Sequence, residues 1–493
     1  MVINMKICLI LLACLVGFVL ATNPGAQIRI SQHGIQYAGN VLVQKLAEKF
    51  AGQPIPDING KSGKVKYEFK NMRVTNFNPP QFTAKVNPGQ GVSLTLSGAT
   101  LSVHGDWRYK IKILFPISDS GSVDVSLYDV TITNSVVFGE AQGHPTVRST
   151  GCSCNIGNVN IDIHSGLDWL YNLFKDYIEK KIESTLRDKL CELLDKEINE
   201  EAAQSLAELK MITKIGRMSQ EDIMMNFSLV TAPIMGSQYV EAQMSGEIFM
   251  SKDTPGHSGL TPAPFQDTHD TTHMVNIWLS DFILDSFGFS LQKRSLLAYN
   301  FTKDDLKPKD QHFLDIQCDD SSLETKCVGS VVPKLRKIPK YANGSVVVGM
   351  WSTMVPRLNI RPGQLTGLFK GNMAFFVKPT PTADPEYVFT INVTASFLLQ
   401  ASMKGNFIHG KIARSRVRVD VIDSQIGPIS DVGLQWIFNS INTMFIQDQL
   451  NKKGAEGVEL PQIKNVVYVD PEFDLMANSL VVKANLLYNP PGK

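Results

Sequence analysis

The sequence predicts an α+β protein in which long antiparallel strands with one apolar face are covered by a long helix. Three observations favour this fold class: segments that alternate apolar and polar residues, one stretch of about thirty residues with helical spacing, and a recurrence of the same order after a proline-rich segment. The 493 residues are 43% hydrophobic and 19% charged, as in ordinary globular proteins. This composition excludes collagen, coiled coils, extended disorder and polytopic membrane proteins.

Residues 1–21 are predicted to form a secretory signal peptide. Lys6 precedes an apolar stretch at residues 7–20, and small residues lie near the expected cleavage point. An N-terminal membrane anchor is the alternative, which the short apolar run disfavours. We therefore expect a secreted, extracellular protein whose mature chain starts at Thr22.

The mature chain begins with a predicted helix over residues 31–50, and Ser31 is suited to cap its first turn. Three segments then alternate apolar and polar positions, as half-buried strands do: residues 65–69, 92–96 and 123–127. The alternation changes phase at Ser97 and Gly98, which predicts a β-bulge. Strands of this kind, joined by turns, predict a curved antiparallel sheet.

A long helix is predicted over residues 165–198, where apolar side chains recur at i, i+3 and i+4 and Ser165 and Asp168 are placed like a capping box. At 1.5 Å per residue this helix spans about 45 to 50 Å, which is too long for a compact unit of about 100 residues. We therefore expect it to lie along an elongated sheet. A coiled-coil segment is the alternative, but the apolar stripe is wider than an a/d seam.

Residues 251–268 hold three prolines and two glycines and are predicted to be a linker. The element order then recurs: helical spacing at 275–283, strands at 346–350, 387–399 and 407–421, a helix at 428–450 and a last strand at 479–487. We interpret this recurrence as a degenerate internal duplication, with domains at 22–250 and 269–493.

The near-zero net charge hides two regions of opposite sign. Residues 22–112 contain twelve basic and four acidic residues, whereas residues 113–210 contain eight basic and sixteen acidic residues. The balance is therefore plus eight in the first region and minus eight in the second. A neutral total argues against nucleic-acid binding through broad electrostatics.

Five cysteines remain after removal of the signal peptide: Cys152, Cys154, Cys191, Cys318 and Cys327. An odd number allows at most two disulfides, of which Cys318–Cys327 is a local one, and Cys191 is left to pair with Cys152 or Cys154. Zinc binding by Cys152 and Cys154 is disfavoured because the C-x-C spacing is unusual for zinc, and we expect no metal site. Four sequons are compatible with glycosylation: Asn226, Asn300, Asn343 and Asn392.

The start of the mature chain contains Asn-Pro-Gly at residues 23–25, Arg-Ile-Ser-Gln at 29–32 followed by Gly34, Ile35 and Tyr37, and Ile-Pro-Asp at 55–57. These residues resemble the N-terminal signature of the family that contains bactericidal/permeability-increasing protein and lipopolysaccharide-binding protein. Other segments follow in the family's order: residues 152–163, the helix that reaches Cys191, the proline-rich centre, and residues 359–362 and 424–428. The resemblance covers essentially the whole mature chain.

The resemblance implies two twisted antiparallel β-barrels, each closed by a long helix and joined by a central sheet into an elongated boomerang. It implies that residues 22–250 form one barrel with part of the central sheet, and that residues 269–493 form the other barrel with the last strand of that sheet. It further implies a bound phospholipid in an apolar pocket of each barrel and a monomeric protein. It also implies that Cys152, rather than Cys154, pairs with Cys191.

The resemblance also implies a function, which is lipopolysaccharide binding in innate, antimicrobial defence through basic residues at the tip of the first barrel. The matching positions here are Lys61, Lys64, Lys66, Trp107, Arg108, Lys110 and Lys112. Basic side chains can bind the two phosphates of lipid A while an amphipathic aromatic ring lies at the interface. The expected partners are therefore lipopolysaccharide, the bacterial outer membrane and phospholipid.

A phospholipid or cholesteryl-ester carrier is the nearest alternative, disfavoured because no amphipathic helix follows the last predicted strand before residue 493. A secreted esterase is less favoured because the sequence contains no G-x-S-x-G motif, and we expect no enzymatic activity and no catalytic residues.

Overall fold

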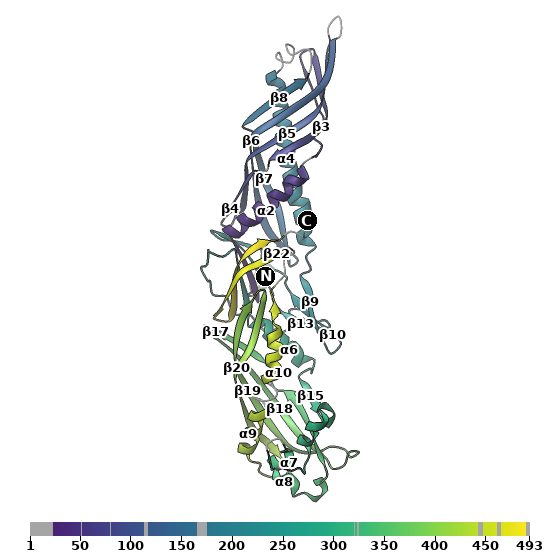
Figure 1. The fold of residues 1–493 in the computed structure, drawn as a ribbon, viewed down its shortest axis with the longest axis vertical. Coiled ribbons are helices and arrows are strands. Elements are labelled where there is room, and N and C mark those ends of the chain that lie inside the picture. Colours follow the sequence, from purple (N-terminus) through teal and green to yellow (C-terminus); the bar gives the residue numbers. More distant parts are fainter. Residues whose placement is uncertain are drawn as a thin grey trace, which may run out of the picture.

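The structure is a computed structural model that describes residues 23–50, 52–78, 80–112, 117–164, 175–319, 321–322, 325–441, 447–460 and 465–489. The predicted signal peptide and the start of the predicted long helix, residues 165–174, lie outside these ranges. Figure 1 shows an elongated molecule with the N-terminal half at one end and the C-terminal half at the other. Within the described ranges, no helix is both long and apolar enough to cross a membrane.

The N-terminal half is built on a seven-stranded antiparallel sheet with the order β2-β3-β5-β6-β7, in which β4 pairs with β5 and β8 with β6. Its strands are β2 (Ile58–Ser62), β3 (Val65–Asn78), β4 (Gln81–Asn87), β5 (Gly91–Ile111), β6 (Ile117–Ala141), β7 (His144–Asn155) and β8 (Asn158–His164). The predicted alternation is confirmed at residues 65–69 and 123–127, whose apolar residues are buried, whereas Leu94 and Leu96 are half-buried like the polar residues between them. The predicted bulge is also confirmed, since the register shifts after Leu96 and Gly98 has a φ of +74°.

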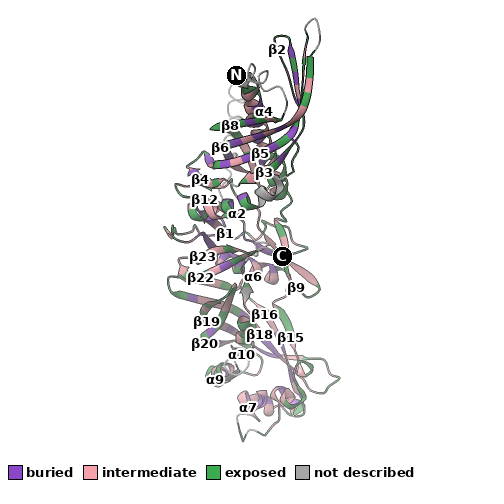
Figure 2. Ribbon diagram, turned by 45° about the horizontal axis from the view of Figure 1, so that its top comes forward, coloured by how far each residue is buried: buried purple, intermediate pink, exposed green. Residues whose placement is uncertain are grey.

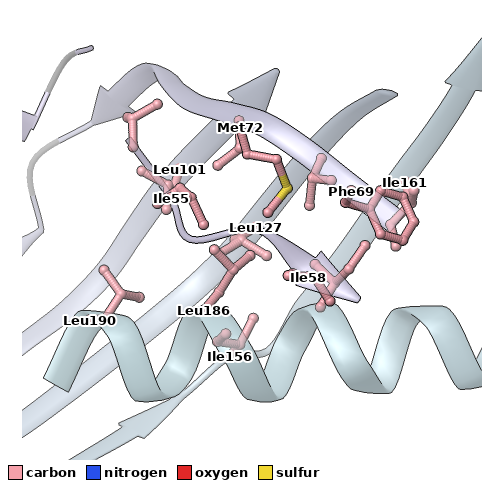
Figure 3. Packing of buried hydrophobic residues seen from close by; sticks show 14 of the residues in the cluster. Ile55, Ile58, Phe69, Met72, Leu101, Leu127, Ile156, Ile161, Leu186 and Leu190 are labelled. Atoms are coloured by element: carbon pink, nitrogen blue, oxygen red, sulfur yellow. The ribbon is translucent and has the colours of Figure 1, made fainter. Parts of the chain in front are cut away.

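Helix α2 (Gln32–Phe50) follows β1 (Ala26–Ser31), and the Ser31 Oγ accepts a hydrogen bond of 3.2 Å from the Gly34 N–H, as expected of a cap. The long helix comprises α4 (Lys175–Lys196), a π-helical turn (Glu197–Ala202) and α5 (Ala203–Ala207), so it extends beyond the predicted end at residue 198. Figure 3 shows Leu186 and Leu190 of α4 pointing toward Leu101 and Leu127 of the sheet.

The C-terminal half contains a second seven-stranded antiparallel sheet, with the order β15-β16-β18-β19-β20-β21 and β17 paired with β18. Its strands are β15 (Ala298–Phe301), β16 (Ser345–Ser352), β17 (Arg357–Arg361), β18 (Gln364–Lys378), β19 (Glu386–Lys404), β20 (Phe407–Ser424) and β21 (Val458–Glu459). The associated helices are α6 (Phe282–Lys293), α7 (Val328–Val331), α8 (Pro333–Arg336), α9 (Asp431–Ile441) and α10 (Gln447–Glu456), with 3-10 turns at Lys303–Asp305, Pro308–Leu314 and Pro339–Tyr341.

A central six-stranded sheet joins the two halves in the order β11-β12-β1-β14-β23-β22. Its remaining strands are β11 (Ile234–Met235), β12 (Tyr239–Met244), β14 (Val275–Ser280), β22 (Val466–Met476) and β23 (Ser479–Tyr488). A separate three-stranded sheet is formed by β9 (Ile212–Met218), β10 (Glu221–Asn226) and β13 (Ile248–Met250). The helical prediction for residues 275–283 is therefore wrong over β14. A short buried apolar run has the same appearance in a helix and in a central strand, and pairing with β1 and β23 makes it a strand.

Arg29 of β1 anchors the central sheet through a buried ion pair. Its guanidinium lies 2.8 Å from the Glu241 carboxylate and 2.7 Å from that of Asp267, and its Cζ lies 3.9 Å from the centre of the Tyr239 ring. Although burial opposes ionisation of Asp267, the hydrogen bond from Arg29 lowers the pKa of this carboxyl. Asp267 belongs to the predicted linker, so this contact fastens the linker to the N-terminal strand.

The two large sheets share their strand order except for the seventh strand, because β8 pairs with β6 whereas β21 pairs with β20. The order β2-β3-β5-β6-β7 corresponds to β15-β16-β18-β19-β20, and a short strand, β4 or β17, pairs with the third strand of each series. The predicted closed barrels are nevertheless wrong. In the described pairings each sheet keeps two edges, and α4 contacts both β2 and β7, the edge strands of the N-terminal sheet. The helix thus occupies the side on which a barrel would close.

Candidate functional site

Six of the predicted basic residues lie together at the end of the N-terminal sheet, and we call this set the basic tip: Lys61, Lys64, Lys66, Arg108, Lys110 and Lys112. Lys61 of β2 pairs in register with Lys66 of β3, which in turn pairs with Lys110 of β5. Directly paired residues of antiparallel strands share a face, so these three ammonium groups form a row across three strands. Figure 2 shows β2 at the end of the molecule, with exposed residues near it.

The acidic side chains near this row have other partners. Glu68, which pairs in register with Arg108, has an ion pair of 3.0 Å with Lys70, and the Asp106 carboxylate accepts a hydrogen bond of 2.8 Å from Asn71. Among the described residues, none of the six cations of the basic tip forms an ion pair. All six are exposed, so the tip presents uncompensated positive charge to the solvent.

Trp107 does not belong to the basic tip, which corrects the expectation that its ring lies at an interface. The side chain is only 6% exposed, lies in the hydrophobic core and stacks on Tyr109 with 5.5 Å between the ring centres. The reason is the strand period of two, which places Trp107 and Tyr109 on one face of β5 and Arg108 and Lys110 on the other. The end of the sheet is therefore cationic outside and aromatic inside.

Two glycines make room for the aromatic side chains of this inner face. A Cβ at Gly60 would lie 1.9 Å from the Tyr67 hydroxyl oxygen, and one at Gly121 would lie 3.1 Å from Trp107 Nε1. In each case the ring lies over a residue of the neighbouring strand that has no side chain. The aromatic packing thus holds the strands that carry the basic tip.

An apolar cavity lies between the helices and the N-terminal sheet. It has a cavity volume of about 40 Å³ and is lined by ten residues, all of them apolar. The lining comes from α2, β3, β5, β6 and α4 and the turn after β3: Val43, Phe77, Pro80, Leu96, Ala99, Leu101, Val130, Ile132, Leu190 and Leu194. The chemistry of this lining suits an alkyl chain and provides nothing for a polar group.

The Cys152–Cys191 disulfide fastens α4 beside this cavity, and it is the pairing that the resemblance implies. Cys191 lies between Leu190 and Leu194, two of the lining residues on α4. Cys154 is free and buried, and its burial raises the pKa of the thiol to about 11. The thiol therefore stays protonated at neutral pH, which makes it a poor nucleophile.

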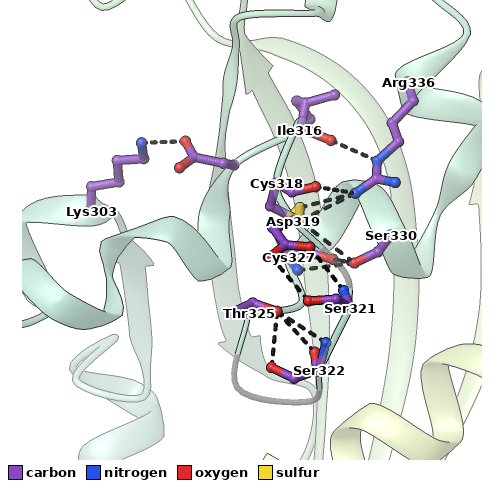
Figure 4. The surroundings of a disulfide bond; sticks show 11 residues. Lys303, Ile316, Cys318, Asp319, Ser321, Ser322, Thr325, Cys327, Ser330 and Arg336 are labelled. Atoms are coloured by element: carbon purple, nitrogen blue, oxygen red, sulfur yellow. Dashed lines mark hydrogen bonds and ion pairs between the residues drawn. A yellow bond between two sulfur atoms is a disulfide. The ribbon is translucent and has the colours of Figure 1, made fainter.

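The Cys318–Cys327 disulfide is present as predicted and belongs to the far end of the C-terminal half. Figure 4 shows the Arg336 guanidinium beside it, where Nη2 lies 3.2 Å from the Cys318 Sγ and Nε donates to the Ile316 carbonyl over 3.1 Å. This arrangement orders a local loop and lies far from the basic tip.

The four sequons differ in accessibility. Asn300 and Asn343 are exposed, whereas Asn226 and Asn392 are half-buried within strands β10 and β19. The Asn392 amide donates to Asn372 Oδ1 over 2.9 Å, so its nitrogen is already engaged.

Within the described part of the chain, no cluster of three or more His, Cys, Asp or Glu side chains is arranged to hold a metal ion.

Sequence reasoning found the basic tip but missed the residues of α2 and the sheet that line the cavity. Alternation marks Leu96, Leu101 and Ile132 as apolar strand positions, yet nothing local separates a lining residue from a packed one. The misplacement of Trp107 was avoidable, because the same alternation that exposes Arg108 buries its neighbour.

The chain matches known proteins over nearly all of its length. Residues 34–202 match the model of the LBP / BPI / CETP family, N-terminal domain, and residues 217–488 match that of the C-terminal domain. It is 25% identical to the bactericidal permeability-increasing protein of Sebastes schlegelii, and the alignment covers 98% of this chain and 99% of that protein. It is 28% identical to the lipopolysaccharide-binding protein of Homo sapiens, and that alignment covers 95% of each protein. A crystal structure of lipopolysaccharide binding protein superposes with a TM-score of 0.59 at 25% identity, covering 94% of this chain and 99% of that one.

Proposed function

The chain belongs to the LBP / BPI / CETP family, and from that premise we propose that it is a secreted, non-enzymatic protein of innate defence that binds the lipopolysaccharide of Gram-negative bacteria. The proposed contact is the basic tip. Phospholipid bound in the apolar cavity is a further part of the proposal. Relatives named for lipopolysaccharide binding support this assignment of ligand class.

The observation that carries the proposal is the row of unpaired cations across β2, β3 and β5. Lipid A presents two phosphates above its acyl chains. The protein surface that binds it must therefore carry several cations close together. Lys61, Lys66 and Lys110 lie in adjacent strands, about 5 Å apart between neighbours. Arg108 adds a planar guanidinium, which can bind a phosphate through two parallel hydrogen bonds.

The cavity supports a separate role for the acyl chains of a phospholipid. Its lining is entirely apolar, but its volume of about 40 Å³ is below the usual range of ligand pockets, so the lining side chains must move apart to admit an acyl chain. Burial of alkyl chains there is favourable by about 25 cal/mol per Å² of apolar surface removed from water. A charged headgroup has no partner in the lining, so it would remain at the open mouth.

The test of the proposal is the triple variant Arg108→Ala/Lys110→Ala/Lys112→Ala. Charge-assisted contacts contribute about 1.5 to 3 kcal/mol each and add incompletely, so we expect a loss of about 3 kcal/mol, roughly a hundredfold in affinity for purified lipid A. Added salt should weaken the wild-type protein more than the variant, because screening acts on the charges that were removed.

The matched control is Lys180→Ala/Lys181→Ala/Lys196→Ala, which removes three exposed lysines from α4. This control should bind lipid A as the wild type does. All six altered residues are exposed, so both variants should keep the wild-type melting temperature. A triple tip variant that binds lipid A as tightly as the wild type at low salt would contradict the proposal.

Phospholipid transfer is a second candidate, favoured by the apolar cavity. In that case binding would depend on the cavity and not on the basic tip. Mass spectrometry of the lipid carried by the purified protein, together with transfer between labelled vesicles, separates the two functions. Vesicle-to-vesicle transfer that is unaffected by the triple tip variant, with no binding of lipid A, would favour the carrier.

A further inference from the structure

A second row of cations lies on the C-terminal sheet, far along the molecule from the basic tip. Strand β20 exposes Lys411, Arg414, Arg416 and Arg418 on one face, and we call this set the arginine row. The register of the sheet establishes that they share a face. Arg414 pairs with Leu398, Arg416 with Ser396 and Arg418 with Thr394 of β19, and across a register shift Lys411 pairs with Gln400.

The neighbouring strands add further cations to this face. Thr394 pairs with Lys370 of β18, and Ser396 pairs with Leu368, which in turn pairs with Arg357 of β17. Both Lys370 and Arg357 are exposed. The face therefore continues the arginine row with two more positive charges, and short polar or aliphatic side chains lie between them.

Acidic residues compensate little of this charge. Arg418 forms an ion pair of 3.1 Å with Asp420, its neighbour two residues along the strand. Within the described part of the chain, no ion pair involves Lys411, Arg414 or Arg416. Three adjacent cations of the row are thus available to a ligand.

The described helices of the C-terminal half lie on the other side of β20. They pack along the edge and the inner face of β20, where Gln435 of α9 accepts a hydrogen bond from the Val419 N–H over 3.0 Å and Asn451 of α10 accepts one from Ile412 over 2.7 Å (Figure 1). Val417 and Val419 point into the core on that side, and the alternating arginines point away from it.

We propose that the arginine row binds a sulfated polysaccharide chain. Residues two apart on a strand are about 7 Å apart, so Arg414, Arg416 and Arg418 span about 14 Å in a line. A ligand that uses all of them must be elongated and must carry repeated negative charges. Guanidinium groups suit sulfate because they offer planar paired donors and are weakly hydrated.

The surroundings of the arginine row favour a flexible chain over a membrane surface. The row lies within the sheet, and strands of a sheet twist, so a flat bilayer would meet only part of it, whereas a polysaccharide can follow the strand. An apolar face beside the cations would strengthen membrane binding. Here the positions paired with the arginines are Leu398, Ser396 and Thr394, of which only one is a large apolar residue.

The experiment compares the full-length wild-type protein with Lys411→Gln/Arg414→Gln/Arg416→Gln for binding to heparin as the probe. The matched control is Lys180→Gln/Lys181→Gln/Lys196→Gln, which removes the same charge from exposed positions of α4. We expect the row variant to bind heparin about tenfold more weakly at low salt and to elute earlier in a salt gradient, since exposed ionic contacts contribute modestly and depend on salt. The α4 control should stay within twofold of the wild type.

The row variant should also keep full affinity for lipid A, so this inference and the proposed function can fail separately. If the triple variant does not fold, Ser396→Glu places a carboxylate opposite Arg416 and should weaken heparin binding by the same route. Equal losses in the row variant and the α4 control would overturn the inference, because net charge alone would then explain binding. Wild-type binding to phosphatidylserine vesicles through this row, without binding to heparin, would overturn it in favour of a membrane surface.

Discussion

Removal of the Cys152–Cys191 disulfide should both destabilise the N-terminal half and loosen the cavity. The bond joins β7 to α4 across a sequence separation of 39 residues. Closing a loop of about 40 residues lowers the entropy of the unfolded chain and stabilises the fold by about 4 kcal/mol on the chain-entropy model. The perturbation is the double variant Cys152→Ala/Cys191→Ala, which leaves no partner for the buried Cys154.

The second disulfide provides an internal comparison. Cys318–Cys327 closes a separation of only 9 residues, for which the same model gives about 2.7 kcal/mol. For a unit of about 200 residues, 1 kcal/mol corresponds to roughly 2 to 4 °C in melting temperature. We therefore expect the first double variant to melt about 8 to 16 °C lower, and Cys318→Ala/Cys327→Ala to lose about two thirds as much.

The functional consequence follows from the position of Cys191 between Leu190 and Leu194, which line the cavity. Without the disulfide, α4 is held over the cavity by packing alone, so a fluorescent phospholipid should exchange faster from the first double variant than from the wild type. Calorimetry and stopped-flow exchange measure the two effects. An unchanged melting temperature together with an unchanged exchange rate would refute the reasoning that this bond holds the helix over the cavity.

Two further predictions concern the central sheet and the sequons. Arg29→Met should lower the free energy of unfolding in urea by about 3 to 5 kcal/mol, because it leaves the buried Glu241 carboxylate without its ion pair. The double variant Arg29→Met/Glu241→Gln should recover part of this loss. A loss below about 1 kcal/mol for Arg29→Met would contradict the prediction. Glycopeptide mass spectrometry of the protein expressed in secretory cells should find glycans on Asn300 and Asn343, which are exposed. It should find none on Asn392, whose amide donates a hydrogen bond to Asn372. A fully glycosylated Asn392 would show that this hydrogen bond does not form during synthesis.

The local pattern of the sequence determined most of the secondary structure. Period-two alternation located β3, β5 and β6, and the phase change at Gly98 located the bulge, because both follow from strand geometry within a few residues. The i, i+3, i+4 spacing located α4, and the nine-residue separation of Cys318 and Cys327 already indicated a local disulfide. The six cations of the basic tip were located by the resemblance to a known family, and the register of β2, β3 and β5 places three of them in a row.

The tertiary structure alone decided which distant segments meet. Residues 275–280 form a strand only because β1 and β23, more than 190 residues away on either side, supply its hydrogen bonds. The choice of a helix-covered open sheet over a closed barrel depends on how α4 lies between β2 and β7. The apolar cavity likewise exists where five elements fail to fill the space between them, which is a property of their packing and not of any one segment. The spacing of apolar residues in the sequence reflects the local geometry of a strand or a helix. The pairing of β14, the open N-terminal sheet and the cavity depend instead on contacts between residues far apart in the chain, which this spacing does not encode.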